Sequence, residues 1–202
     1  MPATTTTGNV TFMGYAASYT VTLAGNLSVA SLTVTNTGAG GNTTTLDTSG
    51  TNYSVTASGS LSIGTAGNSH GAFLANGSTV SVGSTTLQIL TTNSYIDFGS
   101  STWTFSGSTY TNSSTTASWN AGTSTVTFTS ATGGTMTFAG ANLAEAEFNS
   151  VTFTSSAGTA QTFTMATRGL RWLTTLTVSD SSSTTALATA DLAVGAIADT
   201  PD

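Results

Sequence analysis

The fold is decided by a short pattern that is clearest in residues 122–128, which read Gly122-Thr123-Ser124-Thr125-Val126-Thr127-Phe128. A turn-forming segment leads into residues that are alternately polar and apolar, and this period of two is typical of a strand with one buried face. The polar position is nearly always Thr or Ser, and Thr is β-branched and favours strands. The pattern recurs in Val10-Thr11-Phe12, Leu61-Ser62-Ile63, Val80-Ser81-Val82, Trp103-Thr104-Phe105 and Val151-Thr152-Phe153. We therefore expect an all-β protein.

The apolar strand residues also recur at a longer period of about 22 to 25 residues. One register runs through Val10, Leu32, Val55, Val80, Trp103, Val126, Phe148, Trp172 and Val194. A second runs through Val21, Leu46, Phe73, Ile96, Trp119, Leu143, Met165 and Leu187, and a third through Leu61, Leu87, Tyr110 and Met136. Two or three strands per step predict a parallel β-helix (β-solenoid) of about 23 residues per coil. An antiparallel β-sandwich, which also has short, closely spaced strands, is the alternative.

The same pattern gives the expected organisation of the chain. We place the β-solenoid at residues 9–180. Residues 1–8 are expected to be an N-terminal extension or inter-subunit segment, and residues 181–202 a C-terminal coil, cap or linker.

The composition of the 202-residue chain excludes several classes of function. Lys and Arg together number 2 and Cys is absent, and charged residues are 5% of the chain, against about 25% in ordinary soluble domains. Nucleic-acid binding needs cations to neutralise phosphates, and zinc or redox sites built on Cys need thiols. Ser and Thr make up roughly 38% of the residues. The sequence contains no run of about 20 apolar residues, which is the length that a membrane-spanning helix needs. No signal peptide is recognisable near Met1. Since the composition is hydroxyl-rich and almost uncharged, we expect an exported protein at the cell surface or outside the cell.

Three segments together carry a family resemblance: Gly122-Thr123-Ser124-Thr125-Val126-Thr127-Phe128, Phe148-Asn149-Ser150-Val151-Thr152-Phe153 and Leu176-Thr177-Val178. They resemble the β-strand repeats of microbial cell-surface and secreted proteins, including adhesins and autotransporter passengers. The resemblance implies a β-solenoid fold and an extracellular location, and that family has no shared catalytic residues. The chain departs from many relatives in having no Lys.

The candidate chemical groups are few. His70 is the single histidine and lies in the turn-like stretch Asn68-Ser69-His70-Gly71, where we expect an exposed loop residue. Glu145 and Glu147 share a face if they lie on a strand, and paired carboxylates could act as acid and base or bind Ca²⁺. Arg168 and Arg171 follow about one coil later, so we favour structural ion pairs among Glu145, Glu147, Arg168 and Arg171. We expect no catalytic residue, no cofactor and no metal ligand.

Two recurring short motifs are candidates for surface functions. Asn-x-Ser/Thr glycosylation acceptors occur at Asn9, Asn26, Asn42, Asn52, Asn76 and Asn112. Thr-x-Thr motifs occur at Thr20/Thr22, Thr33/Thr35, Thr125/Thr127/Thr129, Thr135/Thr137, Thr152/Thr154 and Thr162/Thr164. Stacked on one flat face, such hydroxyls could order water as ice-binding solenoids do.

The ends of a solenoid suggest the function. Its first and last coils expose strand edges, and neither Met1 to Gly8 nor Asp180 to Asp202 reads as a charged or helical cap. We expect a structural subunit or segment of an extracellular surface fibre, with copies of itself as head-to-tail partners, and not an enzyme. The alternatives are an ice-binding solenoid and an adhesin or carbohydrate-binding module for surface glycans, which would use Trp103, Trp119, Trp172 or Tyr residues as stacking platforms.

Overall fold

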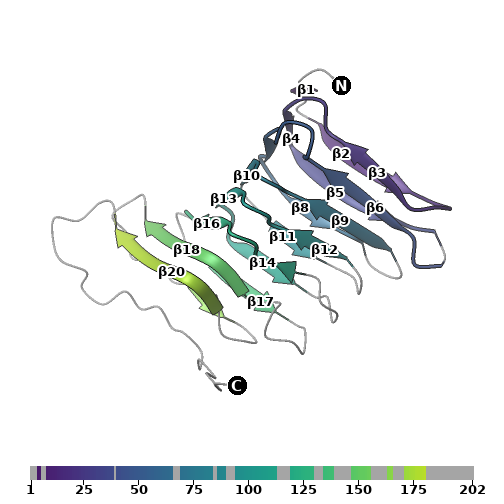
Figure 1. The fold of residues 1–202 in the computed structure, drawn as a ribbon. Helices are drawn as coiled ribbons and strands as arrows, with labels where there is room; N and C mark the ends of the chain where they lie inside the picture. Colours follow the sequence, from purple (N-terminus) through teal and green to yellow (C-terminus); the bar gives the residue numbers. More distant parts are fainter. Residues whose placement is uncertain are drawn as a thin grey trace.

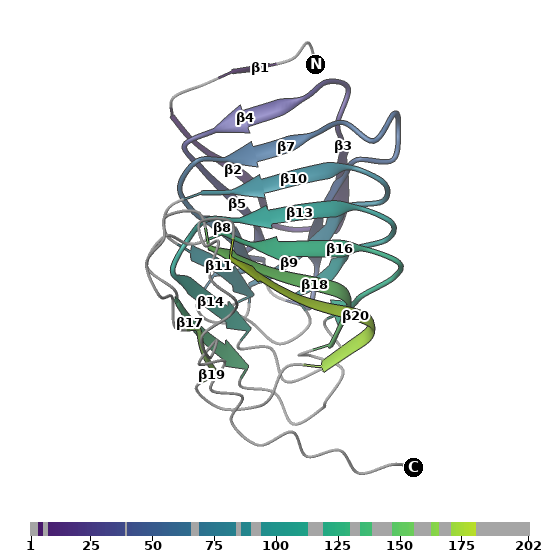
Figure 2. The ribbon, with the colours of Figure 1, turned by 90° about the vertical axis from the view of Figure 1, so that its left-hand side faces the viewer.

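The computed structural model shows a parallel β-solenoid, and every secondary-structure element in its described part is a strand. It describes residues 4–5, 8–38, 40–65, 69–83, 86–89, 94–112, 119–129, 134–138, 147–155, 163–165 and 171–180. The strands form three ladders, which we call sheets A, B and C and which run side by side along the rod (Figures 1 and 2). All pairings between described strands are parallel. The predicted fold class is confirmed, and the antiparallel sandwich does not form.

Each sheet takes at most one described strand from each coil. Sheet A has eight strands: β1 (Thr4–Thr5), β4 (Leu27–Val29), β7 (Val55–Ala57), β10 (Thr79–Val82), β13 (Thr102–Phe105), β16 (Thr125–Phe128), β18 (Glu147–Ser155) and β20 (Arg171–Asp180). Sheet B has seven: β2 (Asn9–Gly14), β5 (Ser31–Asn36), β8 (Leu61–Ile63), β11 (Thr86–Ile89), β14 (Thr109–Asn112), β17 (Gly134–Phe138) and β19 (Phe163–Met165). Sheet C has five: β3 (Tyr19–Thr22), β6 (Thr43–Asp47), β9 (His70–Leu74), β12 (Tyr95–Asp97) and β15 (Trp119–Asn120). From β1 to β16 the chain visits the sheets in the order A, B, C and then returns to A one rung further along. The described strands from β16 to β20 alternate between sheets A and B.

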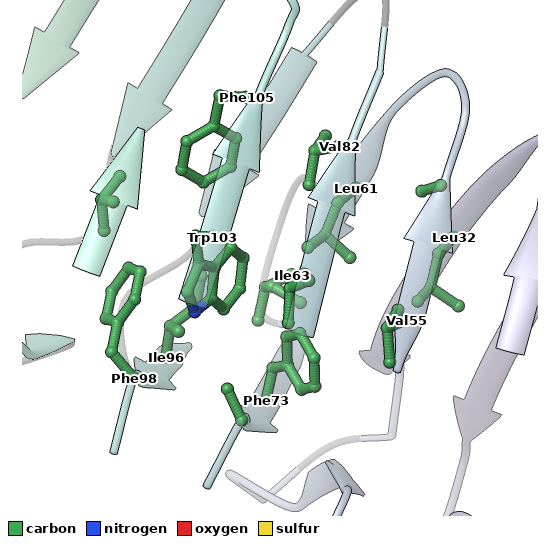
Figure 3. Packing of buried hydrophobic residues seen from close by; sticks show 14 of the residues in the cluster. Leu32, Val55, Leu61, Ile63, Phe73, Val82, Ile96, Phe98, Trp103 and Phe105 are labelled. Atoms are coloured by element: carbon green, nitrogen blue, oxygen red, sulfur yellow. The ribbon is translucent and has the colours of Figure 1, made fainter. Parts of the chain in front are cut away.

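The interior of the coils is filled by the apolar members of the alternating pattern. In sheet A, Val80 pairs with Trp103, and Trp103 pairs with Val126, and all three side chains are fully buried. Side chains from the facing sheets meet them, as Phe73 of β9 does with an edge-to-face contact to Trp103 at 5.5 Å between ring centroids (Figure 3). Trp103 donates its indole N–H to Ser101 Oγ, which satisfies the single polar atom of this large side chain.

The predicted registers are only partly correct. The third register is confirmed, because Leu61, Leu87, Tyr110 and Met136 pair in sheet B. The second is confirmed from Val21 to Trp119, but Met165 belongs to sheet B.

The first register is wrong at both ends. Val10 and Leu32 are partners in sheet B, whereas Val55 lies in sheet A. Near the other end, Val126 pairs with Val151 and not with Phe148. Leu143, Leu187 and Val194 fall outside the described residues. The cause is unequal coil length.

Coil length varies because the turns between strands vary. Leu32 pairs with Leu61, 29 positions later, whereas Val80 pairs with Trp103, 23 positions later. A single fixed repeat length therefore aligns residues from different sheets in the longer early coils, and it aligns the correct partners in the middle of the rod.

The turns that lead from sheet C into sheet A share one backbone conformation in the middle coils. Asn76, Gly99 and Gly122 take equivalent places in successive turns, with φ values of 50°, 54° and 54°. This left-handed region favours Gly and tolerates Asn. Each turn bonds to the previous one, since the backbone N–H groups of Ser100 and Thr123 donate to the carbonyl oxygens of Asn76 (2.6 Å) and Gly99 (2.7 Å).

One described strand lies within the predicted N-terminal segment, residues 1–8. β1 pairs with β4 through Thr4 and Leu27, so strand pairing begins within residues 1–8. Residues 181–202 are not among the described ones.

Candidate functional site

The outer face of sheet A carries two columns of hydroxyl side chains, which we call the hydroxyl face. Where the inward residues of sheet A are Val, Trp or Phe, the outward ones are Thr or Ser. The longer column consists of Ser28, Thr56, Ser81, Thr104, Thr127, Thr152 and Thr177. The shorter column, two residues earlier on each strand, consists of Thr79, Thr102, Thr125, Ser150 and Thr175. Figure 2 shows the strands that carry them side by side.

The hydroxyl groups of this face are available to solvent. All members of the columns are exposed or half-buried. Ser150 Oγ accepts a hydrogen bond from Asn149 Nδ2 at 3.4 Å, and the other column hydroxyls bond to no described residue. Neighbouring rungs are about 4.8 Å apart, which is too far for one hydroxyl to bond directly to the next. The face therefore offers a neutral grid of unpaired donors and acceptors.

The predicted Thr-x-Thr pairs do not form one surface. Thr20 and Thr22 lie in sheet C, Thr33 and Thr35 in sheet B, and Thr125 and Thr127 in sheet A. Thr35 is moreover buried. The continuous grid arises across strands, from Ser28, Thr56, Ser81 and Thr104 among others, because it depends on the register between coils.

A second group of polar residues is buried at the corner between sheets B and C. Asn36 is fully buried; its Nδ2 donates to Ala17 O at 2.8 Å, and its Oδ1 accepts the N–H of Gly38 at 3.0 Å. The hydroxyls of Thr35 and Thr65 lie 3.3 Å apart. These contacts hold the turn backbone against the coil, which is a structural role.

His70 belongs to the same corner, and the expectation of an exposed loop histidine was wrong. It begins β9 and is 8% exposed, and its Nδ1 has no hydrogen-bond partner among the described residues. Its Cα partner on β6 is Thr43. Within the described part of the chain, no group of three or more His, Cys, Asp or Glu could hold a metal ion. His70 therefore has no constellation of acids or bases around it to make a catalytic set.

The end coils differ from the middle ones in burial. Leu32, Val34 and Leu46 of the second coil are fully buried, but their partners one coil earlier, Val10, Phe12 and Val21, are only partly buried. At the other end Leu176 is also only partly buried. The apolar interior is therefore incompletely covered at both described ends of the rod.

Exposed large apolar side chains follow the same distribution. They lie on the first coil or on the last described strand: Met13, Tyr15, Tyr19 and Leu173, which are 61%, 77%, 37% and 57% exposed.

The backbone places one of the predicted ion pairs in adjacent strands. Glu147 of β18 and Arg171 of β20 are Cα partners in adjacent rungs. Glu145 and Arg168 lie outside the described residues. The ion pairs stay a prediction. Glu147 and Arg171 lie on the same sheet A strands as the last members of the columns, before Ser150 on β18 and before Thr175 on β20.

Several predicted glycosylation acceptors have structural roles. The Oδ1 of Asn26 accepts the backbone N–H of Ser54 at 3.0 Å, and the Oδ1 of Asn52 accepts that of Gly77 at 3.1 Å. Each bond joins the turn of one coil to the next coil. These asparagines satisfy backbone donors that the turn leaves unpaired.

Asn76 is still more tightly engaged. Its Nδ2 donates to Asp47 Oδ1 at 2.9 Å and to Leu74 O at 3.1 Å. Asn42 donates to a backbone carbonyl, Asn9 is exposed, and the Asn112 side chain is not among those described. Glycosylation stays a prediction for all of them.

One of the three tryptophans predicted as glycan-stacking platforms is not available on the surface, whereas Tyr15 and Tyr19 are exposed. Trp103 is fully buried and packs between Phe73 and Phe98, so it cannot stack on a glycan. The side chains of Trp119 and Trp172 are not described.

Two tyrosines have raised pKa values for different reasons. Burial raises the pKa of Tyr110, inside the coil, well above its ordinary value of 10.0. Partial burial, Asp97 and Asp47 together raise the pKa of Tyr95, on sheet C. Sheet C therefore presents carboxylates at its outer surface, whereas the columns of sheet A carry none.

Comparisons with known proteins add no relative. No protein-family model, curated protein or solved structure matches the chain. In the described ranges, no helix is long and apolar enough to cross a membrane.

Proposed function

We propose that the chain is a structural segment of an extracellular surface fibre, in which copies stack end to end through their strand edges. The observation that carries the proposal is the half-buried interior of the end coils. Val10, Phe12 and Val21 occupy the same inward positions as residues that are fully covered one coil later. Stacking another coil on this end would remove that apolar surface from water, which is the main favourable term in association.

The edge strands have the chemistry that such stacking needs. In the described structure, β2 and β3 are the outermost strands of sheets B and C. Their sequences, NVTFMG and YTVT, contain no charged residue and no proline. Soluble β-proteins usually protect an edge with charge, proline or a bulge. A coil of another copy can therefore pair in parallel with these unprotected edge strands. The geometry would be the same as between successive coils within one chain.

The extracellular assignment is supported by composition and by resemblance. The chain is nearly uncharged and roughly 38% Ser and Thr, and its strand motifs resemble those of adhesins and autotransporter passengers. A stacked rod has a continuous hydroxyl surface along sheet A, which remains wetted without charge.

The test compares assembly of the wild-type chain with a variant of the first coil. Val10→Lys places a charge at the half-buried end position, where a lysine can reach solvent in the monomer but would be buried unpaired in a stack. Ser62→Lys adds the same charge on the outer face of β8, away from both ends. We expect wild type and Ser62→Lys to form fibres in electron micrographs and to show a mass that rises with concentration in light scattering. Val10→Lys should stay monomeric.

The proposal fails if wild type remains monomeric up to millimolar concentration. It also fails if Val10→Lys assembles as wild type does.

A further inference from the structure

We propose that the hydroxyl face of sheet A binds ice, the ordered lattice of water. The sequence suggested ice binding as a hypothesis, based on Thr-x-Thr pairs. In the structure these pairs are distributed over three sheets. The hydroxyl face consists of the two columns that run through Thr104 and Thr102, in which five successive strands contribute a pair each. Of the predicted pairs, Thr125/Thr127 lies wholly within it.

The first argument is spacing. Equivalent hydroxyls in one column are about 4.8 Å apart, and the two columns are about 6.6 Å apart along the strand. In tetrahedrally bonded water with O···O distances of about 2.75 Å, second-neighbour oxygens lie about 4.5 Å apart, and the hexagonal lattice repeats at about 7.3 Å in the perpendicular direction. The hydroxyl grid is rectangular, and its two spacings are close to these two distances between water oxygens. Hydroxyls on several rungs can therefore occupy lattice positions at the same time.

The second argument is hydrogen bonding. The hydroxyls of Thr104, Thr127 and their column partners make no bond within the described structure, so each can both donate and accept. The threonine members also present a methyl group beside the hydroxyl. Because β-branched side chains are restricted at χ1, the groups are largely held in place before binding, which lowers the entropy lost on binding.

The third argument is what the columns lack. Glycan sites use aromatic stacking platforms, and every member of the two columns is Ser or Thr. Protein docking surfaces have an apolar core, and the apolar residues of β4, β7, β10, β13, β16 and β18 are buried inside the coil, with Leu173 of β20 as the exposed exception. No member of the two columns is charged, although Glu147 and Arg171 lie at the start of β18 and β20 on the same sheet.

The other two sheets carry less regular surfaces. Sheet B also has outward hydroxyl residues, but its column through Thr11, Thr33, Ser62 and Thr111 is interrupted by Gln88. The outward column of sheet C contains Asp47, Leu74 and Asp97. Ice binding is therefore assigned to one face, and a matched substitution on another face is the control.

The experiment measures thermal hysteresis, the gap between melting and freezing temperatures of a single ice crystal in protein solution. Thr104→Lys and Thr127→Lys disrupt the middle of the longer column, and Ser62→Lys is the control on sheet B. Thr104→Val combined with Thr127→Val removes the hydroxyls with little change in shape. Circular dichroism and the melting temperature Tm establish that each variant is folded.

We expect wild type and Ser62→Lys to show hysteresis and faceted crystals. Both Lys variants should fall to the value of buffer alone, and the double Val variant should lose part of the gap. The proposal is overturned if folded wild type leaves crystals unshaped and shows no gap at any concentration. Equal loss in Ser62→Lys and Thr104→Lys also overturns it, since the effect would then not belong to sheet A. Running the same assay on Val10→Lys separates ice binding from fibre assembly, because the hydroxyl face is intact in a single copy.

Discussion

Gly99 lies directly against Asn76 of the preceding coil: a Cβ added to Gly99 would come within 2.4 Å of the carbonyl oxygen of Asn76. The same relationship repeats one coil later, where a Cβ on Gly122 would stand 2.0 Å from Gly99 O. Both glycines also have positive φ. These turns set the distance between coils, and the hydroxyl face on the following strands depends on that distance.

The first prediction concerns these glycines. Gly122→Ala combines a left-handed backbone with a clash against backbone atoms, so we expect a loss of about 1–3 kcal/mol in stability and a lower Tm in circular dichroism. Gly50→Ala is the matched control, because its φ lies outside the left-handed region and its nearest contact is 3.4 Å from Leu23 O. A Gly122→Ala variant as stable as Gly50→Ala would contradict the turn geometry.

The second prediction tests the aromatic interior. Trp103 is fully buried and contacts Phe73, Phe98 and Phe105. Truncation to Ala should leave a large cavity and cost about 3–5 kcal/mol, measured by urea unfolding. Thr104→Ala, on the outer side of the same strand, should change stability by less than about 0.5 kcal/mol. Similar effects from the two substitutions would mean that the strand does not face inward at Trp103.

The third prediction is a pH dependence from Tyr110. Burial raises the pKa of this phenol well above 10.0 in the folded protein, so the folded state holds the proton more tightly than the unfolded chain. This contribution to stability is complete below about pH 10 and declines as the pH rises above it. We expect Tm to fall between pH 9 and pH 11 in wild type, and to fall less in Tyr110→Phe. A Tm profile identical in both proteins would show that Tyr110 is not the group responsible.

The fourth prediction concerns modification at two acceptor sequences. A glycan on Asn76 would take the nitrogen that donates to Asp47 and Leu74. We therefore expect intact and peptide mass spectrometry, on material secreted from a glycosylating host, to find Asn76 unmodified. Asn9 is exposed and is the internal comparison. A fully occupied Asn76 in folded protein would exclude the hydrogen bonds of this turn.

The sequence was informative wherever one strand determines its own faces. Alternation in Val80-Ser81-Val82 and Trp103-Thr104-Phe105 correctly indicated strands with an apolar side, and these side chains fill the coil. Equal spacing of Phe73, Ile96 and Trp119 correctly indicated their stacking in sheet C.

The sequence was less informative wherever turns decide the alignment. The long turn between Thr48 and Ser54 separates β6 from β7, whereas four residues, 75–78, separate β9 from β10. A constant period therefore placed Leu32 with Val55, although Leu32 pairs with Leu61. The hydroxyl face was missed for the same reason, since it is defined across coils.

His70 shows a different limit. Its neighbours Ser69 and Gly71 resemble a turn, yet strand pairing with β6 takes His70 into the corner. Local composition did not indicate this because the pairing partner, Thr43, lies in the neighbouring coil and not in the adjacent sequence.

The regular middle coils have a consequence for how such a chain can change. Ser78, Ser101 and Ser124 occupy equivalent places at intervals of 23 residues, each donating its backbone N–H to a carbonyl three residues earlier. A rung interacts mainly with its two neighbours, so a cut at one of these places and a join at the next removes or adds one complete module. Duplication or deletion of the gene segment that encodes this unit would lengthen or shorten the rod by one coil and keep the same core packing. Selection could therefore change the length of the rod in steps of one coil.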